Sequence, residues 1–263
     1  MYSEVDSAPV VWAMGKPMPQ YSRWQVLAVW AAAALPMALM AWVVAPYFAA
    51  RAGGGLAFAK WLIGCLTLGL VWQGILVAVL VWVERGNLRW TTLKDALWLH
   101  APSDPRSGTK GGGLWWVCLP LVVGLWLAGA LPQPSHDESR NFAAFMGTET
   151  GQAFLAGNWP WYGVVVVMLV FNTVLGEELL FRGLLLPRMN HAFGRADWLV
   201  NGVLFAVYHL HTPWVIPSSL LDAFWFAAPS KYYRSAWMGI VVHSAASVVI
   251  LVMLWPFVWA KRG

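Results

Sequence analysis

The sequence predicts an all-α protein, a polytopic membrane bundle of about 6–8 transmembrane helices. Hydrophobic residues make up 59% of the chain and charged residues only 11%, whereas a soluble domain carries roughly a quarter charged residues. The charged residues are also clustered, so that long uncharged runs remain between them. A helix of ~20 apolar residues crosses the hydrocarbon core, and unbroken apolar runs favour helices over the alternating strands of a barrel.

The positions of the uncharged runs predict the individual helices. Helices are expected at 24–50, 61–83, 114–132, 159–188, 197–212 and 236–259, with a short apolar piece at 214–228. Tryptophans near the ends of these runs suit anchoring at the membrane interface. We interpret residues 1–263 as a single membrane domain. Ionisable residues within apolar sequence gather in its second part, so 24–135 is expected to supply packing helices and 159–252 the functional core.

The charge distribution indicates an orientation rather than a nucleic-acid partner. The formal net charge is +5, but no basic stripe is present, so we expect no binding of nucleic acid. The connection 84–113 holds five basic and three acidic residues, whereas 132–158 holds one basic and three acidic residues. Positive loops stay inside, which predicts that 84–113 and the N-terminus are cytoplasmic. We therefore expect an integral, multi-pass protein of a bacterial or archaeal inner membrane.

Residues 176–182 read Gly-Glu-Glu-Leu-Leu-Phe-Arg within an apolar run. Glu178 and Arg182 are four residues apart, so they share one helix face and can pair. Glu177 points about 100° away from that face and lacks this local partner. Ionisable groups within a membrane helix are costly and usually mark a functional site. On this motif alone, a buried ionic cluster that only fixes helix packing stays equally open.

His209 is expected to lie beside Glu177. The polar stretch 188–197 contains Gly194 and predicts a turn between two antiparallel helices. Glu177 and His209 have their midpoint at residue 193, so each lies ~17 Å from the turn, at matching depth. Asn201, Phe205 and His209 recur every four residues and form one stripe. We expect Phe205 to pack and Asn201 to bond across helices.

His243 and Ser247 are one turn apart in the last apolar run. An imidazole and a hydroxyl at this spacing can donate jointly to an oxyanion. The alternative is a histidine satisfied by a backbone carbonyl, with Ser247 allowing close helix packing. Taken together with Glu177 and His209, a functional role is the better interpretation.

These motifs resemble those of a known family. Glu177-Glu178-x-x-x-Arg182, Phe205-x-x-x-His209 and His243-x-x-x-Ser247 are similar to the motifs of the CPBP family, which comprises the CAAX prenyl endopeptidases and the bacteriocin-processing Abi-type membrane proteins. The resemblance covers residues 159–252. The last family motif usually ends in Asn, sometimes in Asp, and here Ser247 holds that position.

The resemblance implies an intramembrane endopeptidase of the glutamate-dependent kind, acting on a membrane-anchored protein or peptide in the lipid bilayer. Glu177 and His209 would hold the attacking water, and His243 with Ser247 would stabilise the oxyanion. Glu178 and Arg182, with Phe205 and Asn201, would support these residues. No cofactor is then needed. A zinc ion held by Glu177, His209 and His243 is the nearest alternative, followed by a non-catalytic membrane scaffold or chaperone of the same fold and by a transporter.

Overall fold

The structure, a computed structural model, describes residues 17–130, 134 and 138–259. Five helices in this part of the chain are long and apolar enough to cross a membrane. They are Arg23–Ala52, Ala57–Arg85, Gly112–Gly129, Trp159–Arg188 and Ala236–Trp259. The predicted all-α membrane bundle is confirmed.

The long spans are composed as follows. The first joins α1 (Arg23–Leu39), a π-helical turn (Met40–Val44) and α2 (Ala45–Ala52), and the second is α3 (Ala57–Arg85). The third joins a 3-10 turn (Gly112–Val117) to α5 (Cys118–Gly129). The fourth runs from α8 (Trp159–Val170) through two π-helical turns (Phe171–Leu175 and Leu179–Leu185) to α9 (Leu186–Arg188), and the last is α14 (Ala236–Trp259).

Shorter elements complete the bundle. After α9 the chain turns through α10 (Asn190–Phe193) and a 3-10 turn (Gly194–Ala196) into α11 (Asp197–Tyr208). The helix expected at 197–212 thus ends four residues early, because a 3-10 turn (His209–His211) precedes Pro213. The apolar piece expected at 214–228 is broken into a 3-10 turn (Pro213–Val215), α12 (Ile216–Ser219), a π-helical turn (Ala223–Ala227) and α13 (Ala228–Tyr232).

Three short helices lie in the connections between the spans, where no apolar run predicted a helix. They are α4 (Trp90–Ala96), α6 (Phe142–Gly147) and α7 (Glu149–Leu155). Each of the latter two begins at a polar cap, since the side chains of Asn141 and Thr148 accept hydrogen bonds from the first free backbone N–H groups.

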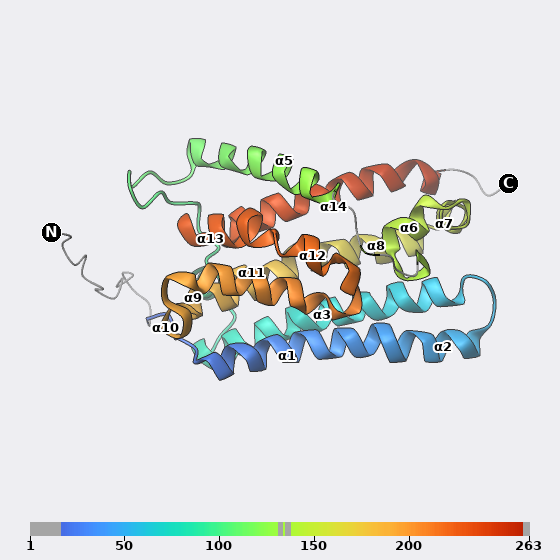
Figure 1. The fold of residues 1–263 in the computed structure, drawn as a ribbon, viewed down its shortest axis with the longest axis horizontal. Coiled ribbons are helices and arrows are strands. Elements are labelled where there is room, and N and C mark those ends of the chain that lie inside the picture. The colour runs from blue at the N-terminus through green and yellow to red at the C-terminus, as the bar shows by residue number, and fades with distance from the viewer. Residues whose placement is uncertain (1–16, 131–133, 135–137, 260–263) are drawn as a thin grey trace.

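The helices form a layered bundle (Figure 1). α1, α2 and α3 lie along one side, α5 and α14 along the other, and α8 and α11 between them. Indole groups of the first span bond the backbone of α11 and of the turn after it: Trp30 Nε1 of α1 donates to the Leu204 carbonyl at 2.8 Å, and Trp42 Nε1 of the following π-helical turn donates to that of Leu210 at 2.8 Å. α1 therefore runs alongside α11 and the His209 turn.

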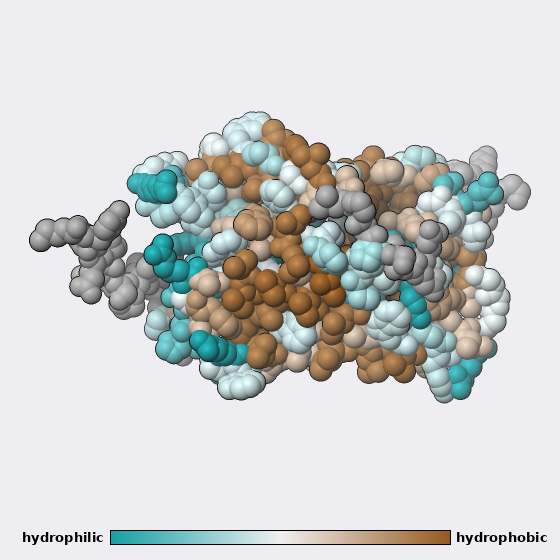
Figure 2. Space-filling model, viewed as in Figure 1, coloured by the Kyte–Doolittle hydropathy of each residue, from teal (hydrophilic) through white to brown (hydrophobic). Residues whose placement is uncertain are grey.

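The outer surface suits a lipid environment. Hydrophobic residues gather across the middle of the face in Figure 2, and hydrophilic residues lie mainly toward the two ends of the long axis. Large apolar side chains such as Trp116, Leu127 and Val252 are exposed on the outside of the spans. Without water at membrane depth, such exposure carries no hydrophobic cost.

Candidate active site

The first functional motif lies at an irregular place in its helix. Gly176, Glu177 and Glu178 separate the two π-helical turns that precede and follow them. A Cβ at Gly176 would lie 2.6 Å from the Phe171 carbonyl oxygen and 3.0 Å from that of Leu70 on α3. Only glycine therefore permits this close approach of two backbones. π-helical turns are rare and occur frequently at functional sites, because they reorient the side chains beside them.

Glu178 is the centre of a buried ionic group. Arg182 Nη1 donates to Glu178 Oε1 at 3.0 Å, as the four-residue spacing predicted. His243 Nδ1 bonds the same oxygen at 3.0 Å, which joins α14 to the motif. Since a carboxylate oxygen only accepts, this Nδ1 carries a proton and Nε2 is left for other partners. A Cβ at Gly239 would lie 2.4 Å from Glu178 Oε2, so this glycine makes the space that the carboxylate occupies.

Glu177 has different partners. The residue is only 1% exposed and interacts electrostatically with Tyr208. Tyr208 in turn accepts a bond from Gln73 Nε2 of α3 at 2.5 Å. Glu177 Oε2 is buried and has no hydrogen-bond partner among the described residues. The hydrogen-bonding capacity of this oxygen is therefore unused by the described residues.

His209 adjoins Tyr208, at the point where α11 ends. Its Nδ1 lies 2.9 Å from the Phe205 carbonyl, which can only accept, so Nδ1 is the protonated nitrogen. Nε2 then carries a lone pair that can bind water. Glu177 interacts with Tyr208, the residue that precedes His209.

The Phe205 ring contacts a residue of each of the three motifs. The Arg182 guanidinium lies 4.1 Å from the centroid of its ring, and the His209 and His243 rings meet it edge-on at 4.9 and 6.1 Å. The other face of His243 is covered by Phe226, stacked at 4.8 Å. A cation over an aromatic face is stabilised by the ring quadrupole, so Phe205 both packs and supports the charge on Arg182.

Asn201 and Ser247 take up separate positions. Asn201 Nδ2 donates to the Phe181 carbonyl at 2.8 Å, so this amide bonds across helices as expected and satisfies a carbonyl in the π-helical turn. Ser247 is buried one turn after His243 on α14. Its neighbour Ser244 bonds Thr173 on the π-helical stretch, at 3.3 Å between the hydroxyl oxygens.

Four further residues of the site were not singled out from the sequence: Gln73, Tyr208, Asp222 and Gly239. Asp222 is buried beside α12 and interacts electrostatically with His243 and Arg182. The sequence does contain a signal for two of these residues. Asp222 is an acid within the apolar piece 214–228, and Gln73 is an amide within the uncharged run 61–83. Tyr208 and Gly239 carried no such signal, because tyrosine and glycine are common in membrane helices.

The residues proposed as zinc ligands are close to one another but do not form a ready metal cluster. In the part of the chain that the structure describes, no group of three or more His, Cys, Asp or Glu side chains has an arrangement that could hold a metal ion. Two of the imidazole nitrogens are already engaged, His209 Nδ1 by a carbonyl and His243 Nδ1 by Glu178.

A comparison with protein families gives a match within the second half of the chain. Residues 158–249 match the family described as type II CAAX prenyl endopeptidase Rce1-like. This segment contains all three motifs and confirms the resemblance to the CPBP family. No curated protein and no solved structure matches the chain.

Proposed function

From the Rce1-like match and the geometry of the buried site, we propose that this chain is a glutamate-dependent intramembrane endopeptidase, which hydrolyses a peptide bond of a membrane-associated protein or peptide. The family match supports a CAAX-type intramembrane protease in general terms. The observation that carries the finer proposal is Glu177 Oε2, a buried carboxylate oxygen without a hydrogen-bond partner among the described residues, placed beside the His209 turn.

Hydrolysis begins with a water molecule held by Glu177 Oε2 and His209 Nε2. Glu177 accepts a proton as the water oxygen attacks the carbonyl carbon of the substrate. His243 Nε2 and the Ser247 hydroxyl stabilise the oxyanion that forms. Glu177 then returns its proton to the leaving amine, so the carboxylate is regenerated at the end of the cycle.

Glu178 and Arg182 act behind these groups. Glu178 holds His243 by Nδ1 and therefore aims Nε2 at the oxyanion, in the way that a buried carboxylate orients a catalytic imidazole. Arg182 balances the charge of Glu178, and the Phe205 ring supports Arg182. The His243 side chain is 15% exposed, so substrate approaches this imidazole and Glu177 lies deeper.

The proposal includes the orientation of the chain in the membrane. The start of α1, the connection 84–113 and the turn 188–197 lie at one end of the molecule (Figure 1). This end carries the basic connection, which the positive-inside rule assigns to the cytoplasm. The substrate's cytoplasmic or membrane-embedded segment would then reach the site between Glu177 and His243.

Reconstituted proteolysis tests the proposal. Wild type and Glu177→Ala are placed in proteoliposomes with a panel of substrates: a prenylated CAAX protein, a bacteriocin leader and a C-terminal membrane sorting helix. Glu149→Ala is the matched control, because this exposed carboxylate on α7 takes no part in the site. We expect cleavage by wild type and Glu149→Ala, read by mass spectrometry, and none by Glu177→Ala.

A chelator separates the metal-free enzyme from the zinc alternative. Cleavage that survives the chelator supports water activation by Glu177 itself, whereas loss of cleavage and its recovery on adding zinc would contradict it. If wild type cuts no substrate while partner proteins still co-purify with it, the non-catalytic scaffold replaces the protease, with Ser247 as the residue that departs from the family pattern.

A further inference from the structure

Tyr208 connects Glu177 to a residue of the N-terminal half. Gln73 lies on α3, outside the segment that matches the family, and is fully buried together with Tyr208. Its Nε2 donates to the Tyr208 hydroxyl at 2.5 Å, and this hydroxyl interacts electrostatically with the Glu177 carboxylate. The Tyr208 hydroxyl therefore stands between the Gln73 amide and the carboxylate that activates water in the proposed function.

One arrangement of the protons gives the Tyr208 hydroxyl both a donor, Gln73, and an acceptor, Glu177. A tyrosine hydroxyl has a single proton and accepts through its lone pairs. Because Gln73 Nε2 is the donor to Tyr208, the hydroxyl proton is free to point at Glu177. The bond then holds the charged carboxylate, and Glu177 Oε2 stays available for water. If the amide of Gln73 were reversed, its oxygen would take the tyrosine proton and Glu177 would lose its donor.

A packing role alone does not account for these residue types. The Tyr208 ring is held by its neighbours, with centroids 5.5 Å from Phe181, 5.2 Å from His209 and 5.4 Å from His211. A phenylalanine would keep these ring contacts. Burying a glutamine amide in a membrane helix costs free energy, so such a residue usually has a functional role. Gln73 Oε1 is also buried without a partner among the described residues, which adds to that cost.

We propose that Gln73 and Tyr208 are positioning residues for Glu177: α3 aligns the general base through the Tyr208 hydroxyl. The proposal rests on the proposed function, since it assigns a task to residues behind the catalytic carboxylate. It also makes the packing half of the chain a contributor to the site.

Kinetics of two single variants and their combination test the alignment. Tyr208→Phe removes the hydroxyl and keeps the ring, so we expect kcat to fall about tenfold with KM within about twofold of wild type. Gln73→Leu is expected to lower kcat less. The double variant is expected to match Tyr208→Phe, because the amide acts only through the hydroxyl. Additive losses, or a kcat equal to that of wild type in Tyr208→Phe, would overturn the proposal.

Tyr162→Phe is the matched control. This tyrosine also lies in a membrane helix, α8, but its hydroxyl bonds the Leu251 carbonyl at 3.3 Å, away from Glu177. We expect its kcat and KM to equal those of wild type. Thermal unfolding in detergent is recorded for all variants, so that a general loss of structure shows itself as a lower Tm and a raised KM.

An infrared measurement tests the same bond without catalysis. The difference spectrum between wild type and Glu177→Gln isolates the carboxyl band of Glu177. We expect Tyr208→Phe to shift this band and Tyr162→Phe to leave it in place, since a hydrogen bond alters the C–O stretch. An unshifted band in Tyr208→Phe overturns the positioning role. A shifted band in a protein that cleaves no substrate would support the hydrogen bond and contradict only the proposed proteolysis.

Discussion

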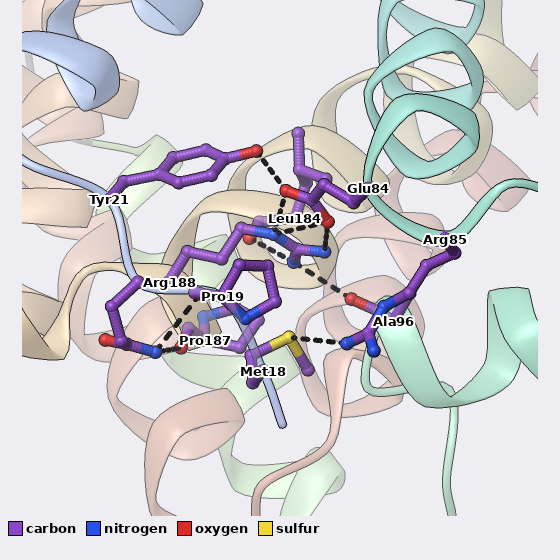
Figure 3. A network of polar contacts seen from close by, with 10 residues as sticks. Met18, Pro19, Tyr21, Glu84, Arg85, Ala96, Leu184, Pro187 and Arg188 are labelled. Carbon is purple, nitrogen blue, oxygen red and sulfur yellow. Dashed lines mark hydrogen bonds and ion pairs between the residues drawn. The ribbon is translucent and has the colours of Figure 1, made fainter. Parts of the chain in front are cut away.

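Arg188, at the end of α9, and Glu84, near the end of α3, form an ion pair in which the arginine is fully buried and the glutamate partly buried (Figure 3). Arg188 Nη2 lies 2.6 Å from Glu84 Oε2, and Nε lies 2.9 Å from Glu84 Oε1. Arg188 Nη1 also donates to the carbonyls of Ala96 and Leu184 at 2.9 and 2.8 Å. The turn that follows the helix of Glu177 is therefore attached to α3.

Breaking this pair is expected to destabilise the fold. Glu84→Gln leaves the Arg188 guanidinium buried without its counter-charge, which costs about 3 kcal/mol when one partner of a buried pair is removed. Thermal unfolding in detergent measures the effect as a lower Tm. Glu149→Gln, on the exposed surface of α7, is the control and should leave Tm unchanged. An unchanged Tm in Glu84→Gln would contradict a structural role for the pair.

The same cluster predicts a loss of stability at alkaline pH. Burial, followed by the hydrogen bond to Glu84, raises the pKa of Tyr21 above its ordinary value of 10.0. A group whose pKa is raised in the folded state stabilises the fold fully below the unfolded pKa, and this contribution is lost as pH rises above it. We expect Tm of wild type to fall between about pH 10 and pH 12. Tyr21→Phe should show a smaller fall over that interval, and equal falls would refute the assignment.

Gly176 offers a test of the close approach between α3 and the helix that carries Glu177. An added Cβ would meet two backbone oxygens, of Phe171 and Leu70, which cannot move as a side chain can. Gly176→Ala is therefore expected to lower the free energy of unfolding by about 1–3 kcal/mol. Gly163→Ala is the control on α8: its Cβ has open space, and alanine favours a helix, so stability should hold or rise. Equal effects of the two substitutions would contradict the packing argument.

Ser247 tests the oxyanion site. Removing one donor to a developing oxyanion lowers kcat strongly, and a mobile hydroxyl contributes less than a fixed amide. We expect Ser247→Ala to lower kcat by about tenfold with little change in KM. Ser244→Ala, which removes a hydroxyl on the same helix that bonds Thr173, serves as the comparison and should lose less. A larger loss in Ser244→Ala would show that helix contact, rather than oxyanion binding, limits the rate.

Much of the architecture could be predicted because it depends on local sequence. The membrane spans follow from uncharged runs of sufficient length, and the bond between Glu178 and Arg182 follows from their spacing on one turn. The position of the turn near Gly194 places Glu177 close to the end of α11.

Other parts depend on contacts between distant segments, which spacing does not reveal. The π-helical turns around Glu177 lie where Gly176 packs against α3 and where the Phe181 carbonyl accepts a second hydrogen bond from Asn201, besides that from the Leu186 backbone. Gln73 reaches Tyr208 across the bundle, over a separation that no local period encodes. The breaks after His209 arise where Pro213 and Pro217 prevent a continuous helix.

The central claim, that Glu177 activates water in a membrane-embedded protease, is tested most directly by turnover of a reconstituted substrate by wild type and Glu177→Gln in the presence of a chelator. The substitution keeps the size of the side chain and removes its capacity to accept a proton. We predict steady cleavage by wild type and a loss of at least about a hundredfold in kcat for Glu177→Gln. Cleavage by Glu177→Gln at the rate of wild type would contradict the account.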